Sequence, residues 1–450
     1  MGEISSWRMA VCLLSCSIAF CGSLTSSVHA STPAAAVTAA PAAAVESLDP
    51  QIVVWTDPLW NYEPAAAYSA EHDEFVVGWW TEQDPSTRDI WARRLRSDGT
   101  LLDVFNVAGV AGDILEQPAI AYCPLHDEYL IAFTNWYQAT GDNADVQARR
   151  VAWNGGWMGE VFTISPGATE HILPSLSFSS LTDEYVVSYT NQYPDIPFSI
   201  TAQRVQAEDG ALVYATGVAP ADGWHRMQSH VAFHPAANGG AGGYLIGYYA
   251  VASSSTRVPY KMALSDLSDV WGNPEQEARE YGPPVFEPEL AAGEAGFLIT
   301  WWEDVGSGYQ VRARRVSTDG VALGSPEGFP VSGTYATNPA TFALEVAYAY
   351  RQRYLVLWTT EDDAGFLDIH GIYVSDLADT TIGAEFTLSD GIGSISEPAA
   401  RCSPASDCLV AYVWWNPPSR DIAARILRPF AVFSDGFESG DTGAWSATLP

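Results

Sequence analysis

The chain has 450 residues, and its 54 acidic side chains outnumber its 21 basic ones, giving a formal net charge of −33 at pH 7. Such a surface repels nucleic acids and anionic membranes, which excludes both as partners, and it favours solubility and cationic partners, including calcium.

Residues 1–30 have the pattern of a secretory signal peptide. Arg8 precedes an apolar run at residues 9–24, and Val28-His29-Ala30 forms a small-x-small cleavage site. We therefore expect a secreted, extracellular or periplasmic protein with no transmembrane segment. Residues 13–16 also resemble a lipoprotein signal, which would anchor the protein through a lipid on Cys16. Residues 31–49 form an alanine- and proline-rich linker.

A short motif then recurs along residues 50–430: an aromatic residue, two branched aliphatic residues, a small residue and another aromatic. Successive copies are 53 to 59 residues apart. A period of this length indicates one supersecondary unit repeated many times. The copies begin at Phe75, Tyr129, Tyr185, Tyr244, Phe297, Tyr354 and, with a cysteine in the first position, Cys408.

Each repeat contains signals for four short strands. The first strand is predicted to open at a proline, such as Pro64 or Pro118, and the second carries the aromatic motif. A third strand follows a longer loop, and an Asp-Gly turn such as Asp98-Gly99 leads to the fourth. Four antiparallel strands in this length are typical of one blade of a β-propeller. The sequence therefore predicts an all-β, seven-bladed β-propeller.

An unassigned strand pattern at residues 51–55 precedes the first repeat, whereas the last repeat lacks a fourth strand. Ile52 lies as many residues before Pro64 as Phe162 lies before Pro174, and Phe162 occupies a fourth-strand position. We expect this segment to complete the last blade and close the ring, leaving no free edge. The alternative is an open stack of sheets.

The repeat region, about residues 51–428, resembles secreted bacterial propellers whose blades carry no enzyme signature. This resemblance implies the fold and not an activity, because propellers include both binding proteins and enzymes. The tail, residues 431–450, contains an acidic glycine-rich stretch from Asp435 to Asp441, followed by Trp445. It resembles a carboxy-terminal tag of exported bacterial proteins. It is either a sorting peptide or a disordered tail.

Polar residues stand immediately before the predicted first strands and should surround one mouth of the central funnel. Glu63 and Glu397 would be neighbours there and could perform acid–base chemistry on a glycan or bind a cation. A structural interpretation is favoured, because amides occupy three of the six positions and accept backbone N–H groups as carboxylates do. The six residues are Glu63, Gln117, Gln228, Glu287, Asn338 and Glu397.

The loops between the second and third strands should emerge on the same face. Their aromatic residues suit a sugar ring or a peptide, or they cover their own blade. These residues are Trp136, Tyr137, Tyr193 and Trp415, and weak calcium-ligand candidates are Asp142, Asn143 and Asp145. His230 and His234 lie too far apart along one strand, about 13 Å, to share a zinc ion without other ligands.

Three cysteines lie outside the signal peptide. Cys402 and Cys408 bracket a turn and are expected to form a disulfide, whereas Cys123 has no partner and should be a core thiol.

No strong catalytic signature is present. The sequence favours a monomeric, non-enzymatic binding or scaffold protein that presents an acidic, aromatic face to a glycan or protein ligand. No cofactor is expected, although calcium binding is an option. The alternative is a polysaccharide-active hydrolase or lyase that uses Glu63 and Glu397 at the funnel.

Overall fold

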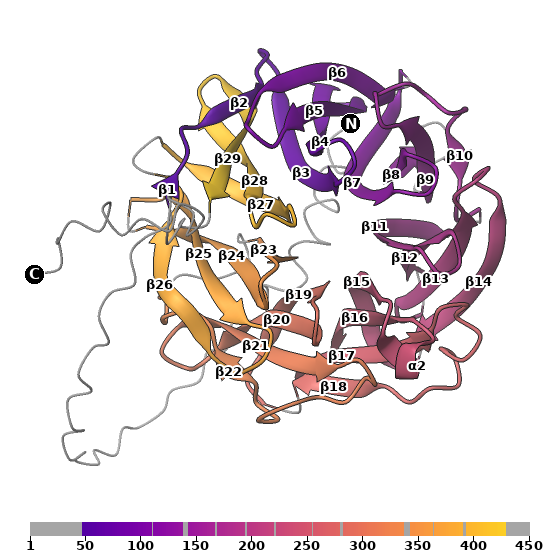
Figure 1. The fold of residues 1–450 in the computed structure, drawn as a ribbon, viewed down its shortest axis with the longest axis vertical. Coiled ribbons are helices and arrows are strands. Elements are labelled where there is room, and N and C mark those ends of the chain that lie inside the picture. The colour runs from indigo at the N-terminus through magenta and orange to yellow at the C-terminus, as the bar shows by residue number, and fades with distance from the viewer. Residues whose placement is uncertain are drawn as a thin grey trace, which may run out of the picture.

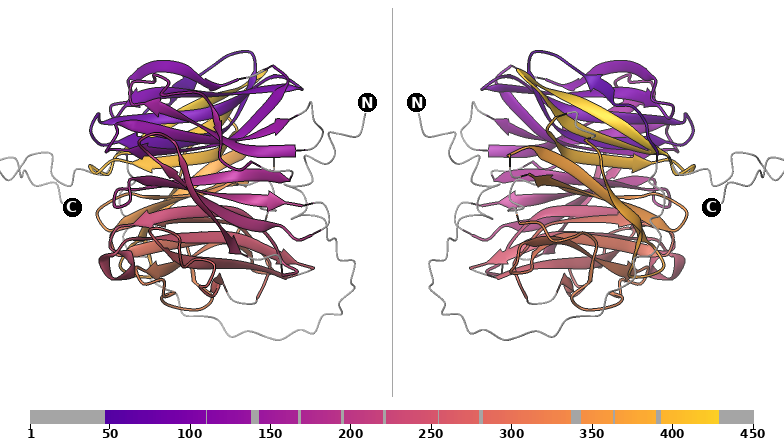
Figure 2. Two further views of the ribbon diagram at one scale, coloured as in Figure 1. Left: turned by 90° about the vertical axis from the view of Figure 1, so that its right-hand side faces the viewer. Right: turned by 90° about the vertical axis from the view of Figure 1, so that its left-hand side faces the viewer.

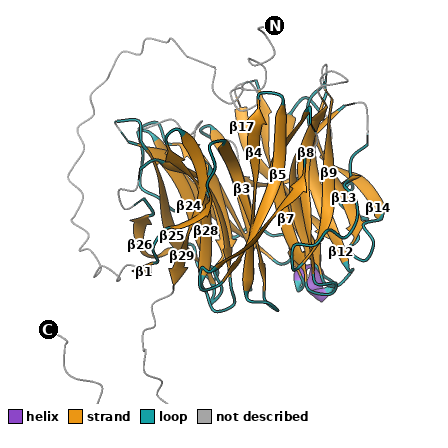
Figure 3. Ribbon diagram, turned by 90° about the horizontal axis from the view of Figure 1, so that it is seen from above, coloured by secondary structure: helices purple, strands orange, loops and turns teal. Residues whose placement is uncertain are grey.

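The computed structural model describes residues 47–428 except 110, 138–142, 167–168, 194–195, 220–221, 254, 280–281, 337–342, 363 and 390–392. The described chain is built of β-strands with a single short helical turn, α2 (Ala237–Gly240), as Figure 3 shows. The predicted all-β class is therefore confirmed. No helix in the described part is long and apolar enough to cross a bilayer.

The strands form antiparallel repeat units in chain order. The first strands are β3 (Trp60–Ser69), β7 (Asp113–Cys123), β11 (Glu170–Ser179), β15 (His225–His234), β19 (Val285–Ala292), β23 (Leu344–Tyr348) and β27 (Ile395–Cys402). The second strands are β4 (Glu74–Asp84), β8 (Glu128–Tyr137), β12 (Glu184–Gln192), β16 (Gly243–Ala252), β20 (Gly296–Asp304), β24 (Arg353–Glu361) and β28 (Cys408–Asn416). The third strands are β5 (Thr87–Arg96), β9 (Asn143–Ala152), β13 (Ser199–Gln206), β17 (Ser255–Leu264), β21 (Tyr309–Ser317), β25 (Leu367–Ser375) and β29 (Ser419–Arg428). The fourth strands are β6 (Leu101–Ala108), β10 (Phe162–Thr163), β14 (Leu212–Ala219), β18 (Gln276–Arg279), β22 (Phe329–Pro330) and β26 (Thr381–Thr387).

The repeat units are arranged around a common axis. Figure 1 shows the first strand of each unit nearest the centre and the later strands progressively farther out. In the side views the strands run from one face of the disc towards the other (Figure 2). Single parallel bridges join neighbouring units, as between Arg88 and Ile114 and between Arg420 and Trp60.

The second strands are buried on both faces because each unit packs between two others. In β4, Phe75, Val77 and Trp79 pack in a cluster with residues of the last unit, such as Leu409. The alternate residue Val76 packs instead with residues of the second unit. Side chains alternate across a strand, so an apolar run that faces two neighbours must be apolar at every position.

Except for β23, the first strands start earlier than predicted and continue through a β-bulge. In β3 the register shifts between Tyr62 and Ala65, and Glu63 in the bulge adopts a left-handed backbone with φ of 46°. The prediction that the strand opens at Pro64 was therefore wrong. A bulge interrupts the hydrogen-bond ladder, so a proline without a donor is accommodated inside the strand.

The leading segment of the described chain pairs with the last strand. β2 (Ile52–Trp55) runs antiparallel to β29, with Ile52 opposite Ala424, and β1 (Ser47–Leu48) continues this pairing. Val54 is fully buried, whereas Val53 is 37% exposed. The segment therefore occupies the outer position of the last unit, with one side of the strand facing the protein interior.

Cys402 and Cys408 form the expected disulfide at the turn between β27 and β28. Cys123 is free and buried, as predicted for a core thiol, and burial raises its pKa to about 11.

Candidate functional site

Bulge residues of adjacent units are joined by hydrogen bonds around the axis. Glu397 Oε2 accepts the backbone N–H of Glu63 at 2.7 Å, and Glu63 Oε2 accepts that of Gln117 at 3.1 Å. Gln117 Oε1 accepts the N–H of Leu173 at 3.2 Å. Carboxylates and an amide thus perform the same task, as the structural interpretation of these positions expects.

This series of hydrogen bonds is interrupted at Leu173, a bulge residue whose side chain has no acceptor atom. The N–H of Gln228 donates instead to Thr190 Oγ1 of β12, at 3.2 Å. Glu287 also lies in a bulge with a left-handed backbone, whereas Asn338 lies outside the described residues.

Glu63 and Glu397 each have a carboxylate oxygen that does not take part in these structural hydrogen bonds. Both carboxylates use Oε2 for these bonds, and no hydrogen bond from a described residue reaches either Oε1. Burial raises the pKa of Glu397 to about 7, and the neighbouring charge of Glu63 adds to the effect. Burial also raises the pKa of Glu63, although hydrogen bonds from Trp80 Nε1 and the Gln117 N–H oppose it. The Glu397 carboxyl therefore holds its proton over part of the neutral range.

A second group of charged residues lies near the axis, and the sequence reasoning missed most of it. His230 Nδ1 lies 3.0 Å from Glu289 Oε2, and Glu345 Oε1 accepts a bond from Arg401 Nη1 at 2.9 Å. Burial raises the pKa of Glu345 to about 7 and that of Glu287 to about 8. Carboxyls on this axis therefore carry protons near neutrality.

A register signal could have revealed these residues. His230, Glu289 and Glu345 all pair with the fourth residue of the aromatic motif, opposite Gly247, Thr300 and Leu357 respectively. When the first strands are aligned by their pairing with the fourth motif residue, instead of by their prolines, His230, Glu289 and Glu345 occupy the same position in their strands. β23 has no proline, so the proline alignment missed Glu345.

The predicted loop aromatics differ in exposure. Trp136 and Tyr137 belong to β8 and are half-buried, so the predicted boundary between strand and loop was wrong there. Tyr137 accepts a hydrogen bond from Gln147 Nε2 at 2.8 Å, which holds its hydroxyl against β9. Tyr193 is half-buried, whereas Trp415 at the end of β28 is 37% exposed.

Trp415 belongs to an aromatic group at the junction of the last and first units. Trp60 in β3 is 45% exposed, and its Nε1 donates to the Pro418 carbonyl at 3.1 Å. Tyr62 stacks on Trp80 with ring centroids 4.3 Å apart, and the Arg420 guanidinium lies among the rings. The sequence reasoning placed Trp60 and Tyr62 before the first strand, although their alternation up to the bulge marks them as strand residues.

The predicted calcium ligands do not gather in the described part of the chain. Asn143 and Asp145 lie on β9 and are half-buried, and Asp142 falls outside the described residues. Asp145 Oδ1 lies 3.5 Å from His171 Nδ1. No group of three or more His, Cys, Asp or Glu side chains among the described residues could hold a metal ion. Calcium binding stays a prediction.

The histidines of the fourth repeat unit have separate partners. His230 binds Glu289, His234 Nε2 lies 3.3 Å from the Glu294 carbonyl, and His225 Nδ1 lies 3.4 Å from the Phe198 nitrogen.

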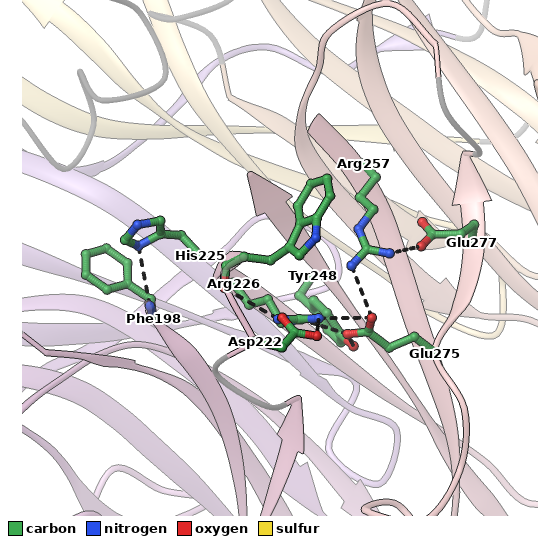
Figure 4. Close-up of polar contacts among 9 residues, drawn as sticks. Phe198, Asp222, His225, Arg226, Tyr248, Arg257, Glu275 and Glu277 are labelled. Atoms are coloured by element: carbon green, nitrogen blue, oxygen red, sulfur yellow. Dashed lines mark hydrogen bonds and ion pairs between the residues drawn. The ribbon is translucent and has the colours of Figure 1, made fainter. Parts of the chain in front are cut away.

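A buried ion network lies beside His225, as Figure 4 shows. The fully buried Arg226 contacts Asp222 at 2.6 Å and Glu275 at 2.7 Å, and Tyr248 also donates to Glu275. Arg257 extends the network from Glu275 to Glu277. Its charged groups are mutually paired, so the network serves to hold the unit together.

A surface hollow of about 450 Å³ lies along β9, β10 and the turn before β14, with Arg150, Phe162 and Asp209 in its lining. Arg150 is paired with Glu128 at 2.7 Å, so the hollow presents little reactive chemistry.

Comparison with known proteins identifies the fold only. No family model and no curated protein matches the sequence. An ulvan lyase described as a polysaccharide lyase of family PL25 superposes with a TM-score of 0.53 at 10% identity, over 84% of this chain and 96% of its own. The polysaccharide lyase Uly1 gives 0.51 at 9% identity, over 85% and 100%. A puromycin hydrolase gives 0.50 at 12% identity, over 81% of this chain and 52% of its own. The chain is thus similar in fold to propeller-like, β-rich proteins.

Proposed function

We propose that this protein is a polysaccharide-active hydrolase or lyase built on a closed, seven-bladed propeller. The pairing of β2 with β29 supports closure, because it supplies the last unit with the outer strand that its own sequence lacks. The propeller-like neighbours include two polysaccharide lyases, which supports a glycan as the ligand.

The observation that carries the chemical part of the proposal is the contact between Glu397 and the backbone of Glu63 at 2.7 Å. It places two carboxyl-bearing residues side by side on the axis and occupies one oxygen of Glu397. A proton on Glu397 is then carried by Oε1, the oxygen that remains available. The pKa of about 7 keeps that proton in place over a useful part of the neutral range.

In a hydrolytic reaction, Glu397 would donate its Oε1 proton to the glycosidic oxygen as the bond to the anomeric carbon breaks. Glu63 would act on the other side, either by deprotonating an attacking water or as the nucleophile. In an eliminative reaction, Glu63 would remove the proton next to a uronate carboxylate while Glu397 protonates the departing oxygen. Both routes leave Glu397 ionised and Glu63 protonated after the bond-breaking step, unless Glu63 is the nucleophile.

A non-enzymatic glycan-binding or scaffold protein is the second candidate. It is favoured by the fact that both carboxylates accept backbone N–H groups, a role that Gln117 fills without any acid–base capacity. In this case the exposed aromatic group around Trp60 and Trp415 would supply the binding surface.

Export is part of the proposal. The Cys402–Cys408 disulfide is compatible with an oxidising compartment, as expected for a protein carrying the signal peptide proposed at residues 1–30.

The test is a degradation screen of the mature protein against neutral, uronate-containing and sulfated polysaccharides. New reducing ends together with ultraviolet absorbance of an unsaturated product indicate a lyase, and new reducing ends alone indicate a hydrolase. Binding without new reducing ends supports the second candidate. If no polysaccharide is bound or cleaved, the proposed activity and the glycan-binding role are both wrong.

A further inference from the structure

Arg420, at the start of β29, is held by aromatic rings. Its Cζ atom lies 4.0 Å from the centroid of the Trp415 ring, 4.5 Å from that of Tyr62 and 5.1 Å from that of Trp60. These distances are within the range of cation–π attraction, which is strongest when the cation is partly removed from water. The rings therefore hold the guanidinium in position without neutralising its charge.

No described residue pairs with this guanidinium. Its Nε is buried without a hydrogen-bond partner, and no carboxylate of a described residue lies within ion-pair distance of it. The charge does act on Tyr62 and Glu397, since it lowers the pKa of both against the larger effect of their burial. The Nε atom of several other arginines, including Arg88, also lacks a hydrogen-bond partner, so it is the missing ion-pair partner that distinguishes Arg420 from Arg88.

Arg88 in the first repeat unit provides an internal comparison. It precedes Asp89 as Arg420 precedes Asp421, and each of the two arginines forms the bridge to the next unit. Arg88 also lies over a ring, with its Cζ 4.5 Å from the centroid of Trp80. In contrast to Arg420, Arg88 contacts the carboxylate of Glu116 and lies 3.8 Å from that of Glu82.

The two sites differ at both positions that carry these carboxylates. Glu82 stands opposite Arg88 in its ladder, whereas Trp415 stands opposite Arg420. Glu116 immediately precedes the bulge residue Gln117, and the residue that precedes the bulge residue Glu63 is Tyr62. The last unit thus has the arginine of this arrangement without the carboxylate that pairs with it. A carboxylate or sulfate from outside the protein could form the planar, charge-assisted contact that Glu116 forms with Arg88.

The surroundings of Arg420 suit a sugar that carries such a group. Trp60 and Trp415 are 45% and 37% exposed, so their ring surfaces remain open to a pyranose ring beside the cation. The acidic surface of the protein opposes an anionic ligand at long range, but that repulsion is screened beyond about 8 Å at physiological ionic strength.

We propose that Arg420, with Trp60, Tyr62 and Trp415, forms a subsite for the anionic group of an acidic sugar, either a carboxylate or a sulfate ester. This proposal rests on the proposed function, because it takes the ligand to be a glycan and specifies its chemical class. The subsite adjoins Glu397, so a sugar bound there would lie next to the axial carboxyl pair.

The test measures binding at 0.15 M salt to two pairs of probes that differ only in charge. Polygalacturonate and its methyl ester report on carboxylates, and dextran sulfate and dextran report on sulfates. We expect the wild type to bind at least one charged probe more tightly than its neutral counterpart, and Arg420→Gln to weaken that binding tenfold or more. Arg96→Gln, an exposed residue of the first unit, is the control for net charge and should bind as the wild type does.

Tyr62→Glu is a second variant that keeps Arg420. It places a carboxylate where Glu116 stands in the first unit, so it should weaken binding of the charged probe by competing for Arg420. Thermal unfolding and circular dichroism verify that each variant is folded. If Arg420→Gln misfolds, Tyr62→Glu and Arg420→Lys, which retains the charge but not the planar fork, decide the question.

The outcomes separate this proposal from the proposed function. Equal binding of charged and neutral probes, or equal effects of Arg420→Gln and Arg96→Gln, overturns the anionic subsite while a polysaccharide activity in the degradation screen stands. If the wild type binds none of the four probes, the subsite is likewise overturned. The proposed function is then judged by the degradation screen alone.

Discussion

The carboxylate of Glu397 accepts the backbone N–H of Glu63 at 2.7 Å, although 334 residues separate them in the chain. This bond links the last repeat unit to the first, and β2, near the start of the described chain, pairs with β29 of the last unit. Glu397 thus contributes to the hydrogen bonds between repeat units and is also one of the two carboxyl groups to which we assign the chemistry.

The pairing of β2 with β29 can be tested with two adjacent valines. Val54 is fully buried, so Val54→Asp would place a charge in the core and should lower the free energy of unfolding by about 3 kcal/mol or more. Val53→Asp is the matched control, because its side chain is 37% exposed and the change should stay within about 0.5 kcal/mol. Urea unfolding measures both. Equal effects would mean that β2 does not pack as described.

Stability should fall as pH rises through the neutral range. Burial raises the pKa of Glu287 from 4.5 to about 8 and that of Glu345 from 4.5 to about 7. A carboxyl with a raised pKa in the folded state holds its proton there after the unfolded chain has lost it. Its contribution is therefore complete below about pH 4.5 and is lost as pH rises through 7 to 8.

The measurement is urea unfolding at a series of pH values between 5 and 9. Glu287→Gln imitates the protonated carboxyl, so this variant should lose less stability than the wild type over that interval. The isosteric Glu160→Gln is the control, because the Glu160 side chain is 96% exposed. A wild-type stability that is constant or rises across the interval would contradict the raised pKa values.

The buried network of Arg226 should be a major source of stability in the fourth repeat unit. Arg226→Ala would leave Glu275, which is 17% exposed, without its closest cationic partner. We expect a loss of about 3 kcal/mol in the free energy of unfolding, as for other buried ion pairs from which one member is removed. Arg96→Ala, at an exposed position, should change stability by less than about 0.5 kcal/mol. If Arg226→Ala lowered the free energy of unfolding by as little as Arg96→Ala does, the network would have to be exposed to solvent, and the description of it as buried would be wrong.

Trp415 should contribute to glycan binding. Trp415→Ala removes an exposed ring beside the axial pair, and we expect about a tenfold loss of affinity, which corresponds to about 1.4 kcal/mol. Trp157→Ala is the control, since Trp157 is 58% exposed but stacks on Arg149 instead, with its ring centroid 4.0 Å from the Arg149 Cζ. Calorimetric titration with the glycan found in the degradation screen compares them. If both variants lost affinity equally, Trp415 would have no specific role in glycan binding.

The repeat motif carried most of the information about the fold. It identified the second strands because residues such as Phe75 and Val76 must be apolar on both faces to pack between two units. It misplaced the start of the first strands, because Pro64 lies inside a bulge and not at a strand end. A proline marks an interruption of the ladder, and sequence alone does not tell a bulge from a terminus.

The candidate site was predictable only in part. Glu63 and Glu397 could be placed near the axis because each precedes a proline at the same position of its repeat. The environment of Arg420 could not, because it depends on the contacts of Tyr62 and Trp60 from the other end of the chain. Such contacts follow from the arrangement of the units around the axis, which the local pattern does not specify.

The most direct test of the account is to compare wild type with Glu397→Gln in the rate of cleavage of the polysaccharide found in the degradation screen. Glutamine retains an oxygen that accepts the Glu63 N–H, as Gln117 does for Leu173, so the fold should be retained and thermal unfolding should not move to a lower temperature. It cannot donate a carboxyl proton, so we expect the rate to fall by about 100-fold or more. A Glu397→Gln variant that cleaves at the wild-type rate would contradict the assignment of chemistry to this pair.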